Sequence, residues 1–127
     1  MLLKKLLNWK KIKKDKDLSR VITFLKVNLI NVNFSVYLSG SYSSESKKNP
    51  SKDSDIDLFL FIDNDNFEKM ERKLFVKDGM KGVYYRNNEF IDSVNFLLND
   101  NYDIVFCNKR YEKSISQGMD LIYKHKR

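Results

Sequence analysis

The feature that most constrains the fold is a pair of short apolar runs with polar residues at their ends. The first run, residues 34–38, leads into Gly40-Ser41, and the second run, residues 56–62, starts beside two aspartates. Apolar runs of this length, bounded by turn residues, predict two buried β-strands. Because residues i and i+2 of a strand point to the same face, Asp55 and Asp57 are expected to project together.

The chemistry of these residues favours a site for a metal ion and a phosphate. Paired carboxylates repel each other and are costly to bury without a cation, and Mg²⁺ commonly takes one or two carboxylates, waters and nucleotide phosphates. Gly40 permits close backbone approach, Ser41 supplies a hydroxyl, and the residues after it are expected to begin a helix whose N–H groups face an anion. The turn and the carboxylate pair would converge on one triphosphate.

This order of residues resembles a known family. Gly40-Ser41, a polar spacer and Asp55-Ile56-Asp57-Leu58 are similar to the signature of the DNA polymerase beta-type nucleotidyltransferase superfamily, most closely its minimal, antitoxin-like members. That family carries a third carboxylate on a later strand, between apolar residues, and Asp103 in the run of residues 102–106 has this setting. Asp92 is the alternative, but its surroundings predict a helix, so we prefer Asp103.

The chain departs from the family pattern in the segment between the two motifs. Many members carry an arginine shortly after the Gly-Ser pair, whereas this chain continues Tyr42-Ser43-Ser44. Thirteen residues separate Ser41 from Asp55, which is longer than in the compact members. The lysines of this spacer are candidates to replace the arginine, although lysines in polar loops are usually only solvated. These candidates are Lys47, Lys48 and Lys52.

Periodicity along the rest of the chain predicts an α/β (α+β) fold, a small mixed β-sheet flanked by helices. The resemblance implies the nucleotidyltransferase (polymerase beta palm-like) fold, and the chain length predicts a single domain over residues 1–127. An N-terminal helical region would occupy residues 1–31 and the catalytic core residues 32–123. The expected helices are 18–31, 64–76 and 89–99, and the later strands are 102–107 and a final edge strand, 119–123.

Composition narrows the class of protein without identifying a partner. Hydrophobic residues make up 42% of the chain and aromatic residues 13%, which argues against disorder. The single cysteine, Cys107, is expected in the core and is typical of a reducing, cytoplasmic protein, and no apolar run reaches membrane-spanning length. His125 is expected to be exposed. The net charge of +7 fits either nucleic-acid affinity or a genome rich in A and T.

The resemblance implies a Mg-dependent nucleotidyltransferase that moves AMP from ATP, or another nucleoside monophosphate, to a protein or RNA acceptor. Asp55 and Asp57 would hold Mg²⁺ on the nucleotide, Asp103 would help hold a second Mg²⁺, and Gly40 and Ser41 would contact the nucleotide. Minimal members are often antitoxins of a HEPN-type RNase toxin. Two alternatives stay open, a small-molecule (antibiotic) nucleotidyltransferase and a non-catalytic binding module of the same fold. An exposed sheet edge is compatible with a homodimer or a hetero-complex.

Overall fold

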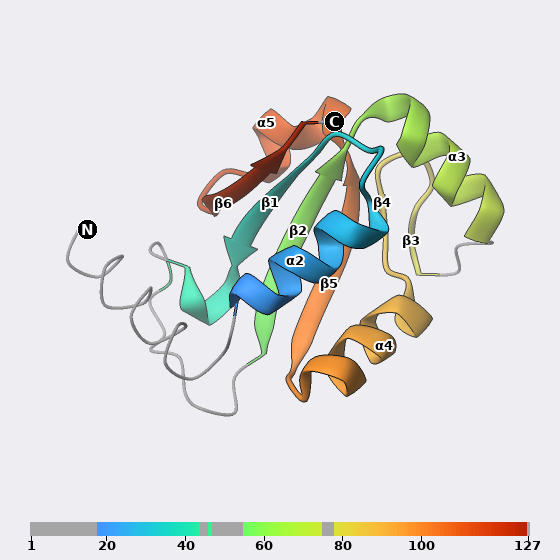
Figure 1. Cartoon of the computed structure of the whole chain (residues 1–127). Helices are drawn as coiled ribbons and strands as arrows, with labels where there is room; N and C mark the ends of the chain where they lie inside the picture. The colour runs from blue at the N-terminus through green and yellow to red at the C-terminus, as the bar shows by residue number, and fades with distance from the viewer. Residues whose placement is uncertain (1–17, 44–45, 47–54, 75–77, 127) are drawn as a thin grey trace.

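The computed structural model describes residues 18–43, 46, 55–74 and 78–126 (Figure 1). The first 17 residues, which include most of the expected N-terminal helical region, lie outside this range. The three candidate lysines of the polar spacer also lie outside it. The two apolar strand runs and the carboxylate, glycine and serine candidates of the site are described.

The described strands form one six-stranded sheet in the order β3-β4-β5-β2-β1-β6. The central strands β2 and β5 run parallel, and the other neighbouring pairs run antiparallel. The mixed sheet flanked by helices confirms the predicted fold class. The strands are β1 (Phe34–Ser39), β2 (Ile56–Ile62), β3 (Gly79–Met80), β4 (Tyr84–Tyr85), β5 (Tyr102–Asn108) and β6 (Asp120–His125).

Two antiparallel helices cover one face of the sheet, α2 (Leu18–Asn28) and α4 (Asn88–Leu98), which lie in front of it in Figure 1. They touch through the rings of Phe24 and Phe90, whose centroids are 5.7 Å apart. The buried residues Leu18, Val21 and Leu25 of α2 follow a helical spacing, and the helix ends three residues before the predicted end at residue 31. No helix of the described residues is long and apolar enough to cross a membrane.

A third helix, α3 (Asn64–Leu74), follows β2 directly. Its N-terminus is capped by Asp63, whose carboxylate accepts hydrogen bonds from the backbone N–H and the side-chain amide of Asn66. Such a carboxylate satisfies one of the free N–H groups at the start of a helix. The predicted helix over residues 64–76 therefore begins as expected, and its described part ends at Leu74.

Side chains alternate across the sheet, so the central strands contribute to two apolar clusters. The even-numbered residues of β2 are fully buried against the helices. The odd-numbered residues belong to the opposite face, where Phe61, Val105 and Cys107 form a smaller cluster. Burial raises the pKa of the Cys107 thiol to about 12, so this cysteine is a core residue, as predicted.

The strand β6 lies at the edge of the sheet, as predicted, but it extends to His125. The expectation that His125 is exposed is wrong. Its ring is half-buried, with its centroid 5.0 Å from that of Phe34, and its Nε2 lies 3.2 Å from the carbonyl oxygen of Ile30. Pairing of β6 with β1 brings this terminal residue onto the core.

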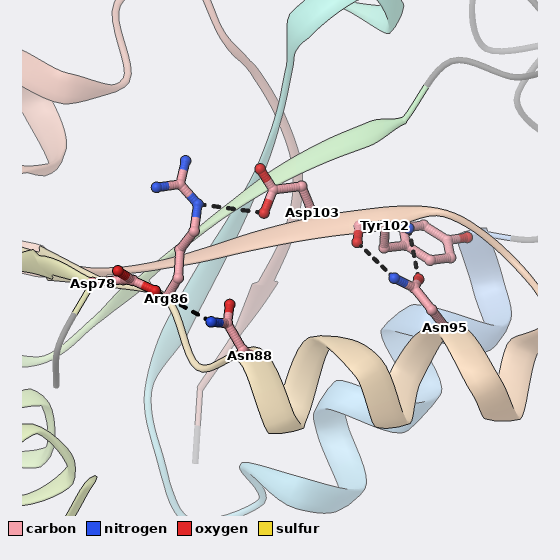
Figure 2. Close-up of polar contacts among 6 residues, drawn as sticks. All are labelled: Asp78, Arg86, Asn88, Asn95, Tyr102 and Asp103. Atoms are coloured by element: carbon pink, nitrogen blue, oxygen red, sulfur yellow. Dashed lines mark hydrogen bonds and ion pairs between the residues drawn. The ribbon is translucent and has the colours of Figure 1, made fainter. Parts of the chain in front are cut away.

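Asn95 joins α4 to β5 through two hydrogen bonds with the backbone of Tyr102 (Figure 2). Its Nδ2 donates to the carbonyl at 3.0 Å, and its Oδ1 accepts from the N–H at 2.6 Å. We expect Asn95→Ala to lower the free energy of unfolding by about 1–3 kcal/mol, because both backbone groups lose their side-chain partner. Urea denaturation measures this change.

Asn88→Ala is the matched control for that substitution. Asn88 is exposed, and its amide donates one hydrogen bond of 3.2 Å to Asp78 (Figure 2). Its replacement should change the free energy of unfolding by no more than about 0.5 kcal/mol. Equal effects of the two substitutions would show that the contact between α4 and β5 does not stabilise the fold.

Candidate functional site

The candidate site lies where β1 ends and where β2 and β5 begin. Because β1 is antiparallel to β2, and β2 is parallel to β5, these three ends meet at the same edge of the sheet. The register pairs Ser39 with Asp57, and Asp57 with Asp103. Neighbouring strands are about 4.8 Å apart, so the two aspartates are adjacent. Leu58 and Ile104, the residues that directly follow the two aspartates, face the helices. Because neighbouring residues of a strand point to opposite faces, Asp57 and Asp103 belong to the face opposite α2 and α4.

The carboxyl group of Asp57 is the electrostatic centre of the site. Its side chain is half-buried, and its pKa is raised above the usual value for an aspartate. The causes, in order of size, are desolvation, the charge of Asp103 and the charge of Asp55, and the positive charge of Arg86 acts in the opposite direction. The site therefore carries an excess of negative charge, which a bound cation would relieve.

Gly40 follows β1 with a positive φ of 70° and lies directly against Asp57. A Cβ atom on this residue would overlap Oδ2 of Asp57 and lie 3.0 Å from its Cγ. The sequence predicted that Gly40 permits close backbone approach. The structure shows that the group approached is the side chain of Asp57. Only a residue without a side chain lets the turn approach the carboxylate this closely.

The helix expected after Ser41 falls largely on residues 44–45 and 47–54, which lie outside the described residues. The described residues form a single 3-10 turn, η1 (Gly40–Tyr42), which ends at Ser43. The carbonyl of Gly40 accepts hydrogen bonds from the N–H of Ser43 at 3.1 Å and from its hydroxyl at 2.8 Å. Tyr42 is fully buried and so anchors the turn in the core. The turn is too short to act as the N-terminus of an anion-binding helix.

The other residues that the sequence predicted for the site differ in how far they are exposed to solvent. Ser41 is half-buried within the turn, and Asp55 is exposed immediately before β2. The alternative carboxylate, Asp92, is exposed on α4, as its helical surroundings predicted, and is therefore not on the strand beside Asp57. Among the residues that the structure describes, no three acidic, histidine or cysteine side chains are close enough together to hold a metal ion. The structure thus pairs Asp57 with Asp103 across neighbouring strands, and Asp55 acts on Asp57 through its charge.

Sequence reasoning missed a basic residue of the site, Arg86. Its Nε lies 3.4 Å from Oδ1 of Asp103, and Figure 2 shows the guanidinium beside this carboxylate. Arg86 follows β4, which pairs antiparallel with β5, with Tyr85 opposite Phe106. Because Tyr85 packs among the helix-side residues, the next residue takes the face of Asp103. Local sequence does not say which strand the short segment before Arg86, residues 84–85, joins.

Comparison with known proteins identifies the family. A family model described as a nucleotidyltransferase domain matches residues 18–121, a range that contains all of the site residues described above. No curated protein and no solved structure matches the chain significantly. Since the family model covers well over half of the 127 residues, the chain belongs to the nucleotidyltransferase domain family, within the polymerase beta superfamily.

Proposed function

We propose that this chain transfers AMP from ATP to a hydroxyl group of a protein or RNA acceptor in a Mg²⁺-dependent reaction. The observation that carries the proposal is the register of the central strands, which sets Asp57 beside Asp103 and against the turn at Gly40. A magnesium ion bound with a triphosphate commonly takes one or two carboxylates, and a glycine turn allows the backbone to approach the phosphates closely.

The residues present fit a magnesium ion. The site offers hard carboxylate oxygens and an excess of negative charge at Asp57, and Mg²⁺ is usually held by one or two carboxylates together with substrate phosphates. Asp57 would be the principal ligand, Asp55, immediately before the same strand, its partner, and Asp103 a ligand for a second ion. When bound, Mg²⁺ would neutralise the negative charge that develops on the phosphates during transfer.

The proposed reaction is an in-line displacement at the α-phosphorus of the nucleotide. The oxygen of the acceptor hydroxyl forms a new bond to the α-phosphorus, and the bond from this phosphorus to the bridging oxygen of the β-phosphate breaks. Pyrophosphate leaves with the electron pair of that bond, and Asp103 accepts the proton of the hydroxyl. Gly40 and Ser41 would orient the phosphates, so that positioning and charge neutralisation supply most of the catalysis.

The resemblance to minimal members of the superfamily supports a protein acceptor. Such members are often antitoxins that modify a tyrosine of a HEPN-type RNase toxin. We therefore propose that the acceptor is a partner of this type, with an RNA acceptor as the second choice within the same chemistry. A small molecule, such as an antibiotic, is the third.

The experiment that tests this function is label transfer from α-labelled ATP, with Mg²⁺, into a lysate of the source cells. We expect one macromolecule to be labelled by the wild-type chain, and nuclease and protease treatment then separates RNA from protein acceptors. If a folded chain transfers label from none of the four nucleoside triphosphates and binds none of them with Mg²⁺, the proposal is wrong. The chain would then be a binding module of the same fold.

The role of Asp103 is tested by comparison with Asp92, the alternative carboxylate. We expect Asp103→Asn to lower the initial rate of label transfer by about 100-fold, because a neutral amide neither holds a cation nor accepts the proton. Asp92→Asn makes the same change of charge on the exposed surface of α4 and should leave the rate unchanged. Similar rates of label transfer for the two variants would show that Asp103 has no role in the reaction.

A further inference from the structure

Arg86 forms a weak ion pair with Asp103 of the candidate site. Its Nε is 3.4 Å from Oδ1 of Asp103, which is longer than the 2.7–2.9 Å of a strong charge-assisted hydrogen bond. The two side chains are 42% and 36% exposed. Ion pairs with this exposure contribute little to stability, because water screens them. The pair can therefore be exchanged at low cost for a stronger partner of the arginine.

The guanidinium group of Arg86 has donors that this ion pair does not use. Only Nε takes part in it, and Figure 2 shows the two terminal nitrogens extending away from Asp103. A guanidinium presents its donors in a planar fork that matches two phosphate oxygens at once. The side chain is thus suited to bind a phosphate group that approaches on the face of the sheet opposite α2 and α4.

Arg86 also acts on the centre of the site. Its positive charge opposes the repulsion that Asp103 and Asp55 exert on Asp57. Arg86 follows β4, on one side of the aspartate pair, and Gly40 follows β1, on the other side. A nucleotide bound at Asp57 would therefore lie between the turn and the guanidinium. Its polyphosphate carries more negative charge than one carboxylate and would attract Arg86 more strongly.

We propose that Arg86 is a phosphate-binding residue, held by Asp103 in the free protein and transferred to the polyphosphate of the nucleoside triphosphate when the substrate binds. The proposal rests on the proposed function and deepens it by naming the side chain that recognises the polyphosphate. Transfer of the arginine also leaves the carboxylate of Asp103 free for its role toward the acceptor hydroxyl.

The first test compares the affinities of Mg·ATP and Mg·AMP, measured by calorimetry. Arg86→Ala should weaken Mg·ATP binding by about 10- to 100-fold, the loss expected for charge-assisted contacts, with a much smaller effect on Mg·AMP. Arg86→Lys keeps the charge without the planar fork and should give an intermediate loss. Arg110→Ala is the matched control, because it removes the same charge from η2 (Lys109–Tyr111), beyond the opposite end of β5. It should leave both affinities unchanged.

The second test uses inorganic pyrophosphate in EDTA and therefore needs no metal ion and no activity. If Asp103 and phosphate compete for Arg86, Asp103→Asn should bind pyrophosphate more tightly than the wild type. In the Arg86→Ala background, Asp103→Asn should give a much smaller gain. Equal gains in both backgrounds would show that loss of negative charge, and not release of the arginine, causes the tighter binding, and would overturn the proposal.

Failure of this proposal can be told apart from failure of the proposed function. If the wild type transfers label and binds Mg·ATP, and Arg86→Ala binds it equally well, only the role of Arg86 is wrong. If the wild type binds no nucleoside triphosphate with Mg²⁺, the proposed function is wrong and the role of Arg86 falls with it.

Discussion

Asp57→Asn is expected to reduce label transfer by about 1,000-fold or more. A metal ion supplies several kcal/mol of transition-state stabilisation, and each tenfold in rate corresponds to about 1.4 kcal/mol. Asparagine keeps the shape of the side chain but removes the charge that would hold the ion. Initial rates measured at saturating Mg²⁺ and ATP test this expectation. A variant with wild-type activity would show that Asp57 holds no catalytic ion.

The same substitution should make the fold more stable. Asp57 is half-buried, and its pKa is raised by desolvation and by two neighbouring carboxylates, so its charged form is unfavourable in the folded protein. In EDTA at pH 7, we expect Asp57→Asn to raise the free energy of unfolding by about 0.5–1 kcal/mol, because screening by solvent limits the repulsion. Loss of activity together with a gain in stability is typical of an active-site residue.

The gain in stability should depend on pH with a definite sign. Because the pKa of Asp57 is higher in the folded than in the unfolded chain, protonation of this carboxyl favours the folded state. The advantage of Asp57→Asn is therefore present at neutral pH and should disappear as the pH falls through the folded-state pKa toward about 3.9. Urea denaturation of both proteins across this range measures the difference.

Asp65→Asn controls for the general effect of removing a negative charge from this basic protein. Asp65 is exposed in the first turn of α3, where a carboxylate interacts favourably with the helix dipole. This variant should lose a few tenths of a kcal/mol, opposite in sign to the change at Asp57. Destabilisation by Asp57→Asn would indicate instead that the carboxylate stabilises the fold.

Gly40→Ala is expected to damage both stability and activity. An added Cβ atom would overlap the carboxylate of Asp57, and the positive φ of this residue disfavours any side chain. We expect the free energy of unfolding to fall by about 2–4 kcal/mol, because backbone strain and steric overlap add. Displacement of the carboxylate by about 1 Å should reduce label transfer by about 100-fold.

Gly118→Ala separates the steric overlap from the backbone strain. Gly118 has a similar φ of 79°, but no described residue beyond its two chain neighbours lies within 4 Å of the position that its Cβ atom would occupy. It should lose only about 1–2 kcal/mol, the part due to the backbone, and keep full activity. The double variant Gly40→Ala, Asp57→Ala should recover part of the stability lost in Gly40→Ala. Equal losses in the two glycine variants would show that the contact with Asp57 is not tight.

Local pattern explains why much of this fold could be predicted from the sequence. An element formed at each place where the sequence had a local signal. These signals are the helical periodicity of residues 18–31, the apolar runs of β1 and β2, and the apolar setting of Asp103. The helical surroundings of Asp92 likewise placed it on α4. The adjacency of Asp57 and Asp103 was anticipated only through the family resemblance, because the parallel pairing of β2 and β5 joins distant parts of the chain.

What could not be predicted depends on contacts between elements. Arg86 reaches the site because β4 adds to the outer side of β5, and no local pattern specifies that pairing. His125 is half-buried because β6 pairs with β1, although its basic sequence neighbours suggested exposure. The turn that begins at Gly40 ends at Tyr42, whose side chain is buried in the core. The polar neighbours of Tyr42 in the sequence did not indicate this burial.

The parallel pairing of β2 with β5 has a consequence for the order of folding. Asp57 and Asp103 are distant in sequence, and contacts of this kind form slowly because a long loop must close first. Until β5 docks, Asp57 does not experience the repulsion of its neighbour. The repulsion between Asp57 and Asp103 therefore arises late in folding. Partly folded chains in which β5 has not yet docked should be inactive. Recovery of activity during refolding would report the docking of one strand.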